Sequence, residues 1–312
     1  MVTAALLGVS ALAAALIGDR VLDVLIARDR LTARTLLRVW AALTAGVFVA
    51  AASSVAIVAI PGHASVVGGV LQTCLNGLDS AVSRTLELVA GPGVFALVLA
   101  VSGWRAAAFW RTARRRDLEI GAHHALLARL LNPTGARSPL WLPTSTPMAY
   151  STPGRTEGLI VASEGLRQRL DPAALSAVMA HEQAHVHGHH HLFVRVADCL
   201  SHAVPWLPLT RQASPIVRAL VEFDADAHAA HEHGDAAVVR AITHVHPTAP
   251  AGALGIARDC VDLRLHRLGR SAAPGTRPSR SSSYAAPTAA AMFPILLFLA
   301  GLATVFLAAC PA

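Results

Sequence analysis

The chain has 312 residues, of which 54% are hydrophobic and only 14% are charged. Soluble domains usually carry about 25% charged residues, so this composition argues against a soluble protein. The net charge is +7 and every basic residue is Arg. Many of these Arg residues lie beside apolar stretches, so membrane topology explains them more simply than nucleic-acid binding, and we expect no direct nucleic-acid partner.

Four stretches approach the roughly 20 residues that a helix needs to cross a bilayer, namely residues 1–18, 39–62, 88–110 and 285–309. The first lacks a basic leader and is followed by Asp19 and Arg20, so we interpret it as an uncleaved span rather than a signal peptide. The third contains Arg105, which must either reach the lipid surface or face protein.

The placement of Arg residues predicts how these spans are oriented. Arg residues gather between the first two spans, at 20–38, and directly after the third, at 111–116. Arg-rich loops stay in the cytoplasm, so both ends of the chain should lie outside. We therefore predict a three-span region at 1–110, a cytoplasmic domain at 111–284 and a fourth span within 285–312, in the inner (cytoplasmic) membrane of a bacterium.

The four cysteines are widely spaced and include no C-x-x-C pair, so the sequence indicates neither a cysteine-type zinc site nor a dense disulfide framework. In the predicted topology Cys74 and Cys310 share the outer, oxidising side of the membrane. A disulfide between them and two free thiols both remain open.

The cytoplasmic segment begins with a predicted helix at 117–131, followed by short extended pieces at 140–142 and 148–150 and a strand at 159–162. Asp171 and Pro172 form a strong helix start. That helix should run through His185, and the absence of proline before Pro205 allows it to continue past Gly188.

Further helices are predicted at 215–233, 236–246 and 252–268, and residues 270–284 form a Ser-, Arg- and Pro-rich linker that is a candidate self-cleavage site. The expected fold is mainly α: four transmembrane helices and a cytoplasmic α+β domain.

A candidate metal site lies on the helix that starts at Pro172. His181 and His185 are four residues apart, which stacks both imidazoles on one helix face and suits them to bind a single Zn²⁺ ion. Glu182 adjoins this face without having to coordinate, and so suits the role of general base. Two surface histidines in a His-rich helix are the alternative interpretation.

The helix at 215–233 supplies the acidic partners. Glu222 and Asp226 are also four residues apart, so Glu222 is the expected third ligand and Asp226 the expected partner of a ligand imidazole. Asp224 lies on another face and should be solvated. His228 and His231 are candidate stabilisers of the transition state, although a simple exposed role is the more economical interpretation.

The remaining histidines of this region, His187, His189, His190 and His191, are expected to form a solvated or membrane-edge cluster. Tyr150 precedes a predicted edge element that could pair with a substrate backbone, and a packing role for it is equally open.

These features together resemble the membrane metallopeptidases that share HExxH and a downstream ExxAD-type helix. The stretches 149–155, 159–166 and 171–185, and the layout of the spans, are most similar to the BlaR/MecR antirepressor peptidases. That resemblance implies a zincin-like domain with zinc on His181, His185 and Glu222 and with Glu182 as the catalytic residue. It differs in one respect: no Ser-x-x-Lys motif or penicillin-binding sensor domain follows the last span.

The resemblance implies regulated proteolysis of a protein substrate, such as a BlaI-type winged-helix repressor or the chain itself. An HtpX-like quality-control protease and a non-catalytic zinc-binding signalling protein are the alternative functions. The lipid bilayer is the other expected partner, and the sequence leaves homo-oligomer formation open.

Overall fold

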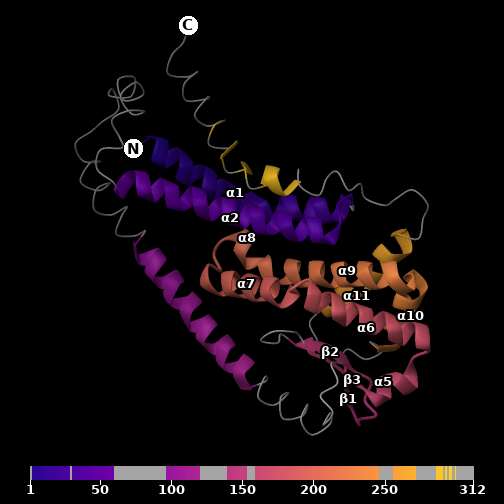
Figure 1. Cartoon of the computed structure of the whole chain (residues 1–312). Helices are drawn as coiled ribbons and strands as arrows, with labels where there is room; N and C mark the ends of the chain where they lie inside the picture. The colour runs from indigo at the N-terminus through magenta and orange to yellow at the C-terminus, as the bar shows by residue number, and fades with distance from the viewer. Residues whose placement is uncertain are drawn as a thin grey trace.

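The computed structural model is mainly helical, with one small sheet (Figure 1). It describes residues 2–28, 30–59, 96–119, 139–152, 159–245 and 256–271, and parts of 286–299. The elements, in chain order, are α1 (Val2–Arg28), α2 (Ala33–Ala59), β1 (Leu140–Leu142), β2 (Ala149–Thr152), β3 (Leu159–Ser163), α5 (Glu164–Arg169), α6 (Pro172–His187), α7 (His190–Ala203), α8 (Pro208–Arg211), α9 (Ala213–His233), α10 (Asp235–Val245) and α11 (Ile256–Ser271).

The N-terminal helices α1 and α2 lie side by side and pack on the rest of the protein, α1 against α8 and α2 against α9 (Figure 1). Small residues such as Ala14 and Ala15 are fully buried at this junction, which lets the helix backbones approach closely. Larger apolar side chains then fill one continuous core, including Leu36 and Trp40 of α2 and Leu220 of α9. The N-terminal pair is therefore an integral part of the fold.

Helix α9 is the central element. It contacts α2, α6, α7, α10 and α11, so residues on several of its faces are covered by protein. Because its neighbours come from both early and late parts of the chain, α9 can bring together side chains that are far apart in the sequence.

The sheet has the strand order β1-β3-β2, with β1 parallel and β2 antiparallel to β3. The three strands lie where the sequence predicts extended pieces. Both β2 and β3 contact α6, which fixes the sheet against the helix that carries the histidine pair. Gly165 is required where the sheet meets α5, because a Cβ at this position would lie 2.1 Å from the carbonyl oxygen of Ser145.

Helix α6 starts as predicted. The Asp171 carboxylate accepts hydrogen bonds from the backbone amides of Ala173 and Ala174, and Pro172 occupies the first turn. The absence of proline before Pro205 would allow this helix to continue past Gly188, but it does not. It ends at His187, and His189 adopts a left-handed conformation with φ 50°, which turns the chain into α7.

One helix of the described residues, at Ala33–Val55, is long and apolar enough to cross a membrane by length and composition. The described residues therefore do not confirm the prediction of four spans. Residues 96–119 form a further helix, in which Arg105 donates a hydrogen bond to the backbone carbonyl of His202. Arg105 therefore faces protein, one of its two predicted positions.

Several predictions fall outside the described residues. These are the greater part of the helix at 117–131, Cys74 and Cys310, nearly all of the linker at 270–284 and most of the span at 285–309.

Candidate functional site

Two helices supply the centre of the candidate site, α6 with His181 and His185 and α9 with Glu222. The Nε2 atoms of the two histidines are 3.1 Å apart, and the Glu222 carboxylate lies 3.4 Å from His181 Nε2 and 3.5 Å from His185 Nε2. One ligand atom from each of the three residues lies within 4.8 Å of the others. The structure therefore brings the three predicted ligands together around one point.

Asp226 lies one helical turn beyond Glu222 on α9 and is buried. Its Oδ1 atom lies 2.9 Å from Nδ1 of His181. A carboxylate can only accept, so Nδ1 of His181 carries the proton and donates it, which leaves Nε2 directed at His185 and Glu222. This is the partnership that the sequence predicts for Asp226.

Arg264 of α11 adds a residue that the sequence reasoning missed. It is 7% exposed and forms two hydrogen bonds with Asp226, from Nε at 2.6 Å and from Nη2 at 2.7 Å. Its Nη1 atom lies 3.0 Å from the Glu222 carboxylate. Nothing in the residues around Arg264 distinguishes it from the other Arg residues of this charged helix, so only the packing of α11 on α9 reveals it.

The charges of this cluster shift the pKa values of its members. Burial alone would lower the pKa of His181, but hydrogen bonds to Asp226 and Glu222 outweigh burial and raise it to about 9. Burial and the neighbouring His181 lower the pKa of His185 to about 4. Burial would raise the pKa of Glu222, yet the contact with His181 and the charge of Arg264 lower it to about 2. The carboxylates thus favour a positive charge between them.

Glu182 lies beside the histidine pair and faces the sheet. Burial raises the pKa of Glu182, and the charge of His181 and the polar groups of Ser151 on β2 partly oppose that rise. A carboxylate with a raised pKa is better suited to take and return a proton near neutral pH.

Two predictions about neighbouring residues are wrong. Asp224 was expected to be solvated, but its side chain is 14% exposed and contacts His190 of α7 and Arg34 of α2. It does lie on another face of α9, and that face is covered because α7 and α2 pack there. His190 was expected in a solvated or membrane-edge cluster, but it is 2% exposed and its Nδ1 lies 2.9 Å from Nδ1 of His185.

The two candidate transition-state stabilisers lie on exposed parts of α9. His228 forms an ion pair with Glu232 at 3.2 Å, and His231 is exposed. The contacts found among the described residues connect neither of them with His181, His185 or Glu222.

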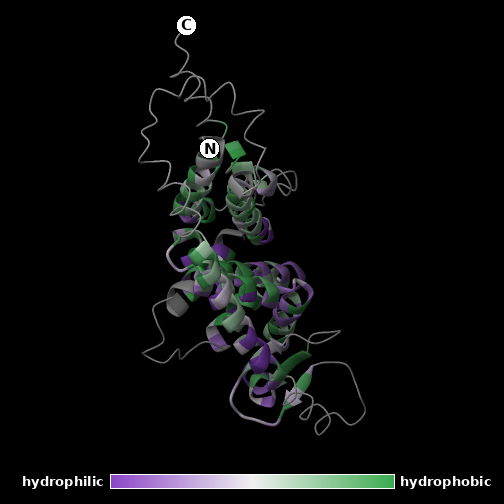
Figure 2. Cartoon of the chain, turned by 90° about the vertical axis from the view of Figure 1, so that its left-hand side faces the viewer, coloured by the Kyte–Doolittle hydropathy of each residue, from purple (hydrophilic) through white to green (hydrophobic). Residues whose placement is uncertain are grey.

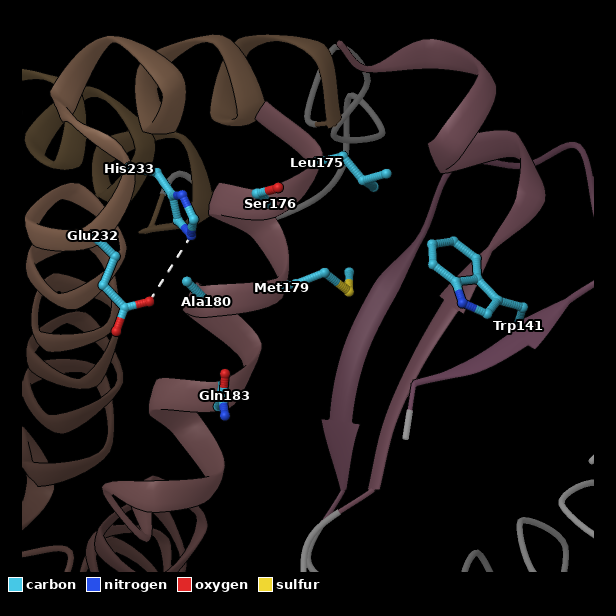
Figure 3. Close-up of a pocket in the computed structure, with 8 residues that line it drawn as sticks. All are labelled: Trp141, Leu175, Ser176, Met179, Ala180, Gln183, Glu232 and His233. Carbon is cyan, nitrogen blue, oxygen red and sulfur yellow. Dashed lines mark ion pairs between the residues drawn. The ribbon is translucent and has the colours of Figure 1, made fainter. Parts of the chain in front are cut away.

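A pocket of ≈ 280 Å³ lies between β1, α6 and the end of α9 (Figure 3). Trp141 and Met179 line one side and Glu232 and His233 the other. Its α6 residues include Ser176, Met179 and Gln183, whose spacing places them on a helix face other than that of His181 and His185. The pocket is thus separate from the histidine pair.

Comparison with known families adds an independent finding. Residues 140–213 match peptidase family M48. The matched stretch runs from β1 to the first residue of α9, so it includes the HExxH segment but not Glu222. No curated protein and no solved structure matches the chain. The match over the sheet and the histidine helix indicates that the chain carries a metallopeptidase domain.

Proposed function

We propose that this chain is a membrane-embedded zinc metalloendopeptidase whose site faces the cytoplasm. The observation that carries the proposal is the convergence of His181, His185 and Glu222 on one point, with Glu182 beside them. Two imidazole nitrogens and one carboxylate form a donor set of catalytic zinc sites, which keep one position open. When bound, zinc supplies Lewis-acid activation of the scissile carbonyl and of the attacking water.

The residues around this point supply the remaining chemistry. Glu182 takes a proton from the water as its oxygen bonds to the peptide carbonyl carbon, and returns that proton to the leaving nitrogen when the C–N bond breaks. The products are a carboxylic acid and an amine. The polar groups of Ser151 on β2 favour the ionised form of Glu182, and β2 packs against α6, which carries this base.

The strand order makes β2 an edge strand, and the same strand holds Ser151. An extended substrate segment would add beside β2 through backbone hydrogen bonds and lie across Glu182. This arrangement favours a polypeptide substrate with an accessible, extended segment.

Apolar surface supports the membrane location. Residues of α1 such as Leu12 and Leu16, and residues such as Leu97 and Trp104 in the helix at 96–119, are large, hydrophobic and exposed. Figure 2 shows hydrophobic colouring along the N-terminal helix pair, whereas hydrophilic residues are frequent in the helices of the metallopeptidase domain. Large apolar side chains that gather on a protein surface indicate contact with lipid or with another protein.

The substrate that we propose is a winged-helix repressor of the BlaI type, on the basis of the resemblance to antirepressor peptidases. General cleavage of unfolded membrane proteins is the alternative. The full chain in lipid vesicles should be incubated with a purified repressor of this type and, separately, with an unfolded reference protein. Cleavage of the repressor alone supports the proposal, and cleavage of both supports the alternative.

The same assay tests catalysis itself. Glu182→Gln removes the base while keeping the size of the side chain, and Glu232→Gln makes the same change at an exposed residue of α9. We expect Glu182→Gln to lower the cleavage rate by roughly 10²–10⁴-fold, and Glu232→Gln to leave it unchanged. Undiminished cleavage by Glu182→Gln would exclude the proposed base.

A further inference from the structure

A second line of contacts runs from the candidate zinc ligand His185 away from the site. Nδ1 of His185 lies 2.9 Å from Nδ1 of His190, and Nε2 of His190 lies 3.2 Å from Oδ2 of Asp224. Oδ2 of Asp224 in turn lies 3.5 Å from Nε of Arg34. Four residues from α6, α7, α9 and α2 are thus linked in a row that ends at the N-terminal helix pair.

The direction of these hydrogen bonds follows from the chemistry of the groups. The Asp224 carboxylate accepts, so Nε2 of His190 donates. In the tautomer with its proton on Nε2 alone, His190 has a lone pair on Nδ1 that can accept from Nδ1–H of His185. The Nε2 atom of His185 is left without a proton, and this is the atom that faces His181 and Glu222. The row therefore selects the tautomer of His185 that can bind a metal ion.

The geometry around His190 supports a positioning role. The side chain is 2% exposed, and its ring meets the ring of His185 edge-on, with 4.9 Å between the ring centres. Gly188 lies directly against it, because a Cβ at position 188 would be 2.4 Å from Nε2 of His190. The left-handed turn at His189 starts α7 at His190, and so places this ring beside α6.

We propose that His190 and Asp224 are positioning residues for His185, and that Arg34 holds Asp224 in place, so that α2 takes part in shaping the metal site. This inference rests on the zinc site of the proposed function. His181 is held on the other side by Asp226 of α9 and Arg264 of α11, so each histidine has its own supporting residues.

The test uses the full chain in detergent and measures zinc affinity by competition with a chromophoric chelator. The visible spectrum of the Co²⁺-loaded chain provides a second measurement that reports ligand geometry without activity. His190→Leu fills the space but cannot accept a hydrogen bond, whereas His190→Asn keeps an acceptor close to the position of Nδ1. We expect His190→Leu to weaken zinc binding roughly 10–100-fold and to alter the Co²⁺ spectrum. His190→Asn should restore most of the affinity and the spectrum.

Arg34→Gln tests the end of the row, and Arg218→Gln is its matched control. Both arginines are 58% exposed and pair with an aspartate, but Arg218 binds Asp198 away from the site. We expect Arg34→Gln to weaken zinc binding by roughly 2–5-fold, as suits an exposed ion pair, and Arg218→Gln to have no effect.

The outcomes separate the two proposals. If the unaltered chain binds zinc and neither His190→Leu nor Arg34→Gln changes its affinity, the positioning role is wrong and the zinc site stands. If the unaltered chain binds no zinc, the proposed function fails and this inference fails with it. Thermal melting of each variant without metal shows whether the fold is retained. Should His190→Leu not fold, Asp224→Asn and Arg34→Gln decide the question.

Discussion

Arg264 on α11 forms a two-point hydrogen bond with Asp226 on α9, and both side chains are buried. Asp226 contacts His181, and Arg264 also contacts Glu222. Arg264, which lies beyond the stretch that matches the peptidase family, thus supports two of the three candidate ligands. The site is completed only when α11 packs on α9.

Replacement of Arg264 by Leu should destabilise the protein strongly. It would leave the buried carboxylate of Asp226 without its charged partner, and breaking a buried pair in this way costs about 3–5 kcal/mol. Denaturant unfolding of the full chain in detergent would measure the change in the free energy of unfolding. Arg218→Leu, which removes an exposed ion pair, should cost less than about 1 kcal/mol. Similar costs for the two variants would contradict a buried supporting role for Arg264.

The sequence was sufficient to predict the centre of this site but not its supports. A four-residue spacing occurs on two helices, between His181 and His185 and between Glu222 and Asp226. Residues four apart lie on the same helix face however the helices pack, so these pairs could be predicted. Arg264, His190 and Arg34 have no such pattern, because their roles depend on which helices lie beside α9. Asp224 shows the same limit: its helix face was predictable, but the covering of that face by α7 and α2 was not.

The end of α6 illustrates a second limit. Composition allowed the helix to run past Gly188, since glycine within a helix costs only about 1 kcal/mol relative to alanine. The chain turns there because His190 packs back against His185 and leaves no room for a side chain at position 188. The structure around the site, rather than helix propensity, sets this boundary.

Gly188→Ala should therefore lower both stability and zinc affinity. The new Cβ would lie 2.4 Å from His190 Nε2 and 2.9 Å from the Ala184 carbonyl oxygen, and overpacking of this kind costs about 1–3 kcal/mol. Gly269→Ala is the control, because nothing lies within 4 Å of a Cβ there and the residue is helical. It should leave zinc affinity unchanged and stability unchanged or slightly higher. Equal behaviour of the two variants would show that position 188 has room for a side chain.

The packing of the N-terminal helices on α9 predicts that they stabilise this helix, which carries Glu222 and Asp226. Leu36 of α2 is fully buried in the core shared with α9, so Leu36→Ala should cost about 2–5 kcal/mol in the free energy of unfolding. Leu12 of α1 is 50% exposed, and Leu12→Ala should have little effect in detergent. The measurement is unfolding of the α9 region, followed by hydrogen exchange. Unchanged protection of α9 in Leu36→Ala would mean that the two parts fold independently.

Removal of metal should abolish proteolysis without unfolding the chain. The core shared by α2 and α9 contains none of the candidate ligands, and the contact between His181 and Asp226 is made by protein side chains. A chelator should stop cleavage of the protein substrate, zinc should restore it, and the helical circular dichroism signal should remain throughout. Cleavage that continues in the chelated protein would argue against a metallopeptidase mechanism.

The proposed activity requires that His181, His185 and Glu222 together bind a metal ion. Metal analysis of the purified full chain, in parallel with Glu222→Ala and with the Glu232→Ala control, tests this in one measurement. The structure predicts one zinc ion per chain in the unaltered protein and in Glu232→Ala, and a large loss of zinc in Glu222→Ala. Absence of zinc from the unaltered chain, or full zinc content in Glu222→Ala, would contradict it.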